Sequence, residues 1–174
     1  MNPWVVTVTS DATRRLLSHA ELVGLANTEE FTFRSMFMAQ AATSHPSMRF
    51  QTEWKKFDLL AQCEAQPTLI EFKYYVLRRT SGLDGTPGGF KGGAGPKNES
   101  EFWRCVEKLA TQVPDSIAER FLVLIYEREY GRRSRYSFHT SFGAIEPKGP
   151  VTDVWSISDG PLEGRVLKIA PHGS

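Results

Sequence analysis

The sequence predicts an α/β protein whose mixed central sheet is flanked by helices. The first observation is the order of the patterns, which is helix, helix, three strands, a glycine-rich loop, helix, strand and further short strands. The second is the continuous apolar run at residues 121–126 (FLVLIY), which is typical of a buried strand. A chain of 174 residues is long enough for one domain with its own core and too short for two. We expect a single domain over residues 1–174, with its core at about 28–127 and short C-terminal strands at 136–170.

The first third of the chain predicts two helices after a short strand. Residues 4–8 are rich in β-prone side chains and predict a short edge strand. Ser10 or Asp11 can cap a helix that ends near Gly24. A second helix is expected over residues 28–43, with its Phe and Met side chains packed on a sheet.

Three strands are expected next. Residues 48–54 alternate between apolar and polar side chains, which indicates a half-buried strand. Lys55 and Lys56 make the turn into a hairpin over residues 58–73. Its second strand is expected to continue to Arg78 and, because it is so long and apolar, to be central in the sheet.

The stretch at residues 81–97 changes character, since it holds seven glycines and two prolines in the run GLDGTPGGFKGGAGP. This composition predicts no regular structure. It lacks the Gly-Lys-Ser/Thr pattern of a phosphate-binding loop. Two interpretations stay open, a flap beside a functional site and a plain flexible linker.

The remaining elements are a helix and several strands. Asn98 or Ser100 can cap a helix over residues 101–112, which Pro114 ends. After the buried strand, short strands are expected at residues 137–142, 154–157 and 165–169.

The candidate chemistry lies on the central hairpin. Residues two apart in a strand share a face, so Glu71 and Lys73 should project together while Ile70 and Phe72 point into the core. If Asp58 lies on the neighbouring strand, its carboxylate reaches the same place, and carboxylates with nearby carbonyl oxygens suit Mg²⁺. The alternative is a plain salt bridge between neighbouring acid and amine side chains.

Asp58, a gap of 12 residues and then Glu71-Phe72-Lys73 resemble the signature of the PD-(D/E)xK nuclease superfamily. The resemblance spans about residues 29–110, and it departs from the named motif in having Phe57 in place of proline before the first acid. It implies a restriction-endonuclease-like α-β-β-β-α-β core and Mg²⁺-dependent hydrolysis of phosphodiester bonds.

The resemblance also implies roles for individual residues. Asp58, Glu71, the main-chain carbonyl of Phe72 and the helical Glu30 would hold Mg²⁺, with Mn²⁺ as an alternative. Asp58, Glu71, Lys73 and Glu30 would form the catalytic set, in which Lys73 positions or deprotonates the attacking water.

Three acids allow simpler explanations. Glu29 and Glu30 fall in the first turn of a predicted helix, where acids favour the positive end of the helix dipole. Glu53 can face the site or be a solvated acid at a strand end.

Nucleic-acid contacts must come from local clusters, because the formal net charge is only +1. Two clusters suit phosphate binding, one flanking the glycine-rich stretch and one interleaved with tyrosines, although the second can also be an ordinary solvated loop. Their residues are Arg78, Arg79, Lys91 and Lys97, and Arg132, Arg133 and Arg135. The expected partner is DNA, with RNA not excluded and a homodimer as one way to cut two strands.

Two other function classes stay open. One is an inactive member of the same fold that binds nucleic acid or protein, and the other is an immunity or inhibitor protein with an acidic face. Cys63 and Cys105 are far apart and form no metal-binding pair, and no apolar run approaches the length needed to cross a bilayer. We expect no membrane partner and a cytoplasmic location.

Overall fold

The computed structural model describes residues 3–63, 66–76, 78–81, 86–91, 94–128 and 137–171. Its helices are α1 (Trp4–Val23), the short 3-10 helix η1 (Leu25–Asn27), α2 (Glu30–Ser44), α3 (Pro96–Thr111) and α4 (Phe138–Phe142). Its strands are β1 (Arg49–Trp54), β2 (Phe57–Cys63), β3 (Gln66–Tyr75), β4 (Arg78–Ser81), β5 (Pro87–Lys91), β6 (Glu119–Glu127), β7 (Val151–Asp159) and β8 (Leu162–Ile169). No helix in these ranges is long and apolar enough to span a bilayer.

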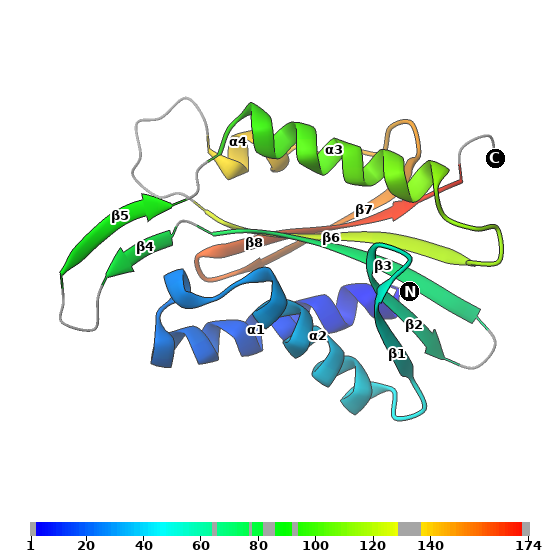
Figure 1. Cartoon of the computed structure of the whole chain (residues 1–174), viewed down its shortest axis with the longest axis horizontal. Coiled ribbons are helices and arrows are strands. Elements are labelled where there is room, and N and C mark those ends of the chain that lie inside the picture. The colour runs from blue at the N-terminus through cyan, green and yellow to red at the C-terminus, as the bar shows by residue number, and fades with distance from the viewer. Residues whose placement is uncertain are drawn as a thin grey trace.

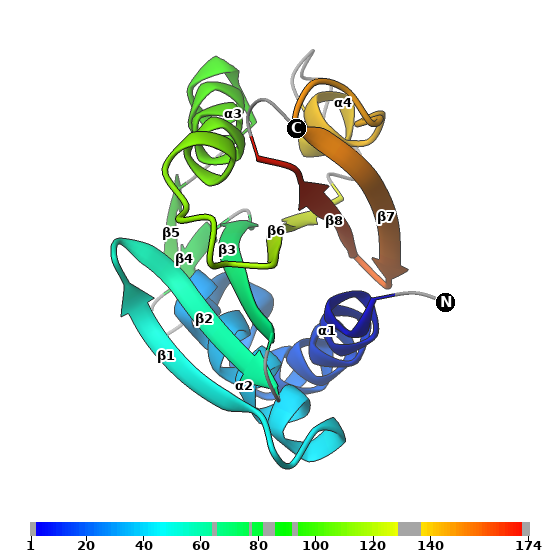
Figure 2. The same ribbon diagram turned by 90° about the vertical axis from the view of Figure 1, so that its right-hand side faces the viewer.

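The main sheet has the strand order β1-β2-β3-β6-β8-β7 and is mixed. β3 and β6 are parallel, whereas each other neighbouring pair is antiparallel. Helices α1 and α2 cover one face, and α3 and α4 cover the other (Figures 1 and 2). The predicted α/β class with a helix-flanked mixed sheet is confirmed, as is the central position of the hairpin's second strand.

Two apolar clusters hold these layers together. On the first face, Phe33 and Phe37 of α2 pack against Phe72 of β3, with ring centroids 6.0 and 5.2 Å apart. On the second face, Phe102 and Leu109 of α3 pack over the buried strands. Strand β6 supplies alternate residues to both clusters, which explains its unbroken apolar run.

The expected edge strand at residues 4–8 is wrong, because α1 begins at Trp4. Val5, Val8, Ala12 and Leu16 recur at helical spacing and are all buried against the sheet. Burial of this stripe outweighs the modest β propensity of the valines. The expected packing of the Phe and Met positions of α2 is also incomplete, because Phe31 is 64% exposed.

One further expectation is corrected on the second face. Residues 137–142 form α4 and no strand, since Ser137 caps the helix by accepting the Thr140 N–H at 2.9 Å. Phe138 and Phe142, four residues apart, both stack on Tyr75, at 5.5 and 5.6 Å between ring centroids.

The glycine-rich stretch is more regular than its composition predicts. β4 and β5 pair as a separate two-stranded sheet, and α3 begins at Pro96, where proline is favoured in the first turn. The hairpin's second strand ends at Tyr75 and does not continue to Arg78. The remaining predicted helices and strands are present with shifted ends.

Arg120 fixes the end of α3 against the start of β6. Its buried guanidinium donates to the main-chain oxygens of Leu109, Ala110 and Val113, at 3.2 to 3.3 Å. The carbonyls of Leu109 and Ala110 lie in the last turn of α3, where helix oxygens have no partner within the helix, and Val113 follows just after the helix. One buried side chain therefore anchors the C-terminal end of α3 to β6.

We predict that Arg120→Met lowers the free energy of unfolding by about 2–4 kcal/mol, since buried carbonyls lose their donor. Urea denaturation measures the change. Arg104→Met, at an exposed position of α3, is the matched control and should change stability by less than about 0.5 kcal/mol. Equal stability of the two variants would contradict the anchoring role of Arg120.

Candidate active site

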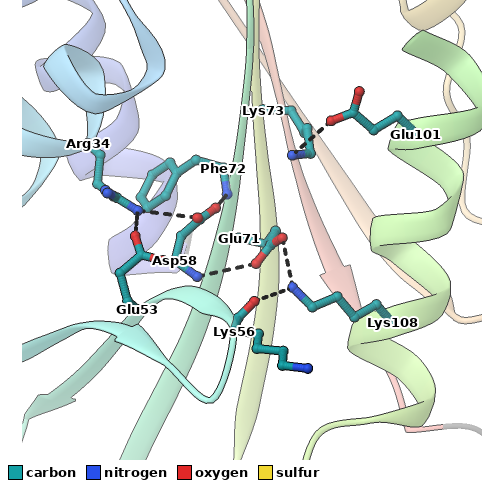
Figure 3. A network of polar contacts seen from close by, with 9 residues as sticks. All are labelled: Arg34, Glu53, Lys56, Asp58, Glu71, Phe72, Lys73, Glu101 and Lys108. Carbon is teal, nitrogen blue, oxygen red and sulfur yellow. Dashed lines mark hydrogen bonds and ion pairs between the residues drawn. The ribbon is translucent and has the colours of Figure 1, made fainter. Parts of the chain in front are cut away.

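The candidate site forms where β2 and β3 separate. Their pairing runs from Cys63 opposite Gln66 to Leu59 opposite Ile70. Just beyond it, the Asp58 carboxylate accepts the main-chain N–H of Phe72 at 2.7 Å, and the Asp58 N–H donates to Glu71 at 3.3 Å (Figure 3). The structure thus brings together the two acids that the sequence analysis singled out.

Glu71 and Lys73 lie on the face of the sheet that α3 covers, as their spacing predicts, while Ile70 and Phe72 belong to the opposite core. Glu71 is only 5% exposed. The Lys73 ammonium forms an ion pair with Glu101 of α3 at 3.4 Å. Lys73 is therefore held near the acids without touching either carboxylate.

Two cations that the sequence analysis missed neutralise the acids. From α2, Arg34 Nη1 donates to Glu53 at 2.7 Å and to Asp58 at 3.2 Å, and its buried Nε has no partner among the described residues. From α3, Lys108 Nζ contacts Glu71 at 3.1 Å. Glu53 pairs with Arg34 at the end of β1, so it borders the site, but its side chain is 67% exposed, as for a solvated acid at a strand end.

Glu30 lies beside this network. Among the described residues, its carboxylate makes no hydrogen bond or ion pair, but the charges of the site change its pKa. Burial, together with the nearby Asp58 and Glu71, raises the pKa of Glu30 to about 7 against the opposing effect of Lys73 and Arg34. Its neighbour Glu29 is the N-cap of α2 and forms a capping box with Thr32.

Burial and neighbouring charges also shift the pKa values of Glu71, Lys73 and Cys105. Burial, then the charge of Asp58, raises the pKa of Glu71 although Lys108 opposes this. Burial alone would lower the pKa of Lys73, but nearby groups outweigh it and raise that pKa, in the order Cys105, Glu30, Glu101 and Glu71. The pKa of the Cys105 thiol is itself raised by burial, so at neutral pH the acids keep Lys73 charged.

The site has the oxygen donors that a hard divalent cation prefers. The cationic groups of Arg34 and Lys108 lie on its two core acids, which shows that positive charge is favoured there. In the described ranges, however, no three His, Cys, Asp or Glu side chains converge closely enough to hold a metal ion as they stand. Metal binding would therefore require these side chains to rearrange.

The predicted nucleic-acid contacts are only partly placed. Lys97 is exposed on the first turn of α3. In the two-stranded sheet, Arg78 of β4 lies opposite Lys91 of β5, and Arg79 is the next residue of β4. These two strands therefore carry three basic residues. Arg132, Arg133 and Arg135 lie outside the described residues.

A second polar cluster, which the sequence analysis also missed, surrounds Glu163. This side chain is 4% exposed, accepts from Tyr126 at 2.7 Å, contacts His139 at 2.8 Å and pairs with Arg128. Burial opposes its charge, but the hydrogen bonds and the nearby Arg128 lower the pKa of Glu163 below its usual value. The cluster ties α4 to the ends of β6 and β8.

No protein-family model matches the chain, and no curated protein or solved structure is significantly similar to it.

We predict that Glu30→Gln changes the pH dependence of stability. A carboxyl group whose pKa is near 7 when folded and 4.5 when unfolded binds more protons in the folded state, so stability falls as pH rises through this window. Glutamine removes this loss. Relative to the wild type, the variant should therefore gain up to about 3 kcal/mol between pH 4.5 and pH 8.

Urea denaturation in EDTA at the two pH values measures this gain. Glu107→Gln, at an exposed position of α3, is the control. A constant difference between wild type and Glu30→Gln at both pH values would show that the Glu30 carboxyl is solvated like any surface acid.

Proposed function

We propose that the protein is a metal-dependent nuclease of the PD-(D/E)xK type that hydrolyses phosphodiester bonds, with DNA as its substrate. The observation that carries the proposal is the meeting of Asp58 and Glu71 at the end of a hairpin, with Lys73 on the same strand and Glu30 on the adjacent helix. The order α2, β1, β2, β3, α3, β6, with β3 parallel to β6, supports a restriction-endonuclease-like core.

The proposed metal ligands are Asp58, Glu71, Glu30 and the carbonyl of Phe72. The Phe72 N–H points toward Asp58, and the carbonyl of a strand residue lies on the same edge as its N–H, so this oxygen also faces the gap between β2 and β3. A bound Mg²⁺ or Mn²⁺ would polarise the phosphate and acidify a water. Glu30 can ligate directly or hold such a water.

Lys73 is suited to an electrostatic role. Burial would lower the pKa of Lys73, but the nearby acids, among them its ion-pair partner Glu101 at 3.4 Å, oppose this and favour the charged form. At neutral pH the side chain is therefore an ammonium and a poor base. A fixed positive charge in a partly buried site stabilises negative charge that develops on the phosphate, and it orients the attacking water. Of the two roles that the sequence left open, positioning is the better supported.

Basic residues on the β4–β5 hairpin and at the start of α3 would contact the substrate backbone. We assign this role to Arg78, Arg79 and Lys91 on the β4–β5 hairpin and to Lys97 at the start of α3. Arg132, Arg133 and Arg135 stay a prediction from sequence, as does a homodimer for cutting both strands. RNA is the alternative substrate.

We predict that Asp58→Asn and Lys73→Met each reduce metal-dependent nicking of plasmid DNA by at least about 100-fold, as expected when a group that stabilises the transition state is lost. Asparagine keeps an acceptor for the Phe72 N–H, so the fold should persist. Glu107→Gln, on the exposed face of α3, is the control and should nick normally. Unchanged nicking by both site variants would exclude this mechanism.

A second function is favoured by one observation. Asp58 and Glu71 already have partners in Arg34 and Lys108, as in a purely structural ionic network. An inactive protein of this kind would bind nucleic acid or a protein partner without metal. Tight duplex binding in EDTA, with no nicking by the wild type in Mg²⁺ or Mn²⁺, would favour that function.

A further inference from the structure

The Lys108 ammonium sits in a well-defined cation position. It donates to the main-chain oxygen of Lys56 at 2.5 Å and to Glu71 at 3.1 Å (Figure 3). It also lies 4.2 Å from the centre of the Phe57 ring. A carboxylate, a carbonyl oxygen and an aromatic face all favour a cation. The side chain is only 22% exposed, so little water shares this position.

The turn that supplies the carbonyl has an unusual backbone. Glu53, Lys55 and Lys56 have φ angles of 54°, 47° and 72°, in the left-handed region that residues other than glycine seldom adopt. Each such residue costs about 1 kcal/mol. Lys56, the last of these residues, is the one whose carbonyl accepts from the Lys108 ammonium.

The main chain of α3 next to Lys108 is anchored, whereas the Lys108 side chain is free to change its rotamer. Arg120 binds the main-chain oxygens of Leu109 and Ala110, the two residues after Lys108. The helix is therefore anchored next to Lys108. The ammonium itself sits on a flexible four-carbon stem and can withdraw without movement of α3.

We propose that the Lys108 ammonium occupies the cation position beside the Glu71 carboxylate in the metal-free protein and competes for this carboxylate with the divalent ion. Lys108 thereby sets the metal affinity of the site. This inference rests on the proposed function. Both cations require the same Glu71 carboxylate, and with Glu71 almost fully buried neither can be replaced by water without a large cost.

The test compares wild type with Lys108→Met, which keeps the stem and removes the charge. Arg104→Met on the exposed side of α3 is the matched control. Titration calorimetry with Mn²⁺ gives the affinity, and thermal denaturation in EDTA and in excess Mn²⁺ gives the stability. We expect Lys108→Met to melt lower than wild type in EDTA, to bind Mn²⁺ at least about tenfold tighter, and to regain stability when Mn²⁺ is bound.

A supporting lysine that does not compete gives the opposite result. Unchanged or weaker Mn²⁺ binding by Lys108→Met, with its loss of stability not restored by Mn²⁺, would overturn the proposal. If the variant is unfolded in EDTA, folding on addition of Mn²⁺ supports the competition, and failure to fold contradicts it. Absence of Mn²⁺ binding in both proteins also overturns it.

The nuclease proposal is tested separately on the same samples. Wild type that binds Mn²⁺, with tighter binding by Lys108→Met but no nicking by either, would refute the nuclease and leave the competition standing. Metal-dependent nicking with equal Mn²⁺ affinity in the two proteins would refute the competition alone.

Discussion

The burial of two neighbouring carboxylates is the constraint on which the rest of the site depends. Asp58 and Glu71 are joined through one main-chain N–H, and Glu71 is almost fully removed from water. An uncompensated buried charge costs several kcal/mol, so the surrounding elements must supply cations. Helix α2 supplies Arg34 from one face of the sheet and α3 supplies Lys108 from the other. The two layers of helices are thus connected through the acids as well as through the apolar core.

The same constraint explains why strand pairing stops where it does. At the end of the β2–β3 ladder, the Phe72 N–H donates to the Asp58 side chain. The two strands can then diverge without an unsatisfied donor at this position. The opening between them is the place where charged side chains from three directions meet. A local exchange of hydrogen-bond partners therefore creates the site without a break in the sheet.

The sequence predicted what depends on local spacing. The shared face of Glu71 and Lys73 follows from the period of a strand, and Asp58 was placed by a hairpin of neighbouring segments. Arg34 and Lys108 could not be found this way, because they lie 24 and 37 residues from the acids that they bind. Local propensity favours strands at residues 4–8 and 137–142, but burial of Val5 and Phe138 in the two cores stabilises helices there.

The order of strands has a consequence for how the chain reaches this structure. β1, β2 and β3 form one meander of near neighbours, whereas β7 touches the sheet only through β8, which follows it in the chain. β7 and β8 are neighbours in the chain and pair antiparallel, so this hairpin needs no long loop to close. Two pairings join distant segments, the antiparallel pairing of β6 with β8 and the parallel pairing of β3 with β6. The β3–β6 pairing, such as Thr68 with Glu119, spans the longer stretch of chain, so closing that loop costs the most entropy. Glu71 and Lys73 lie on that seam, and their final surroundings exist only after it has closed.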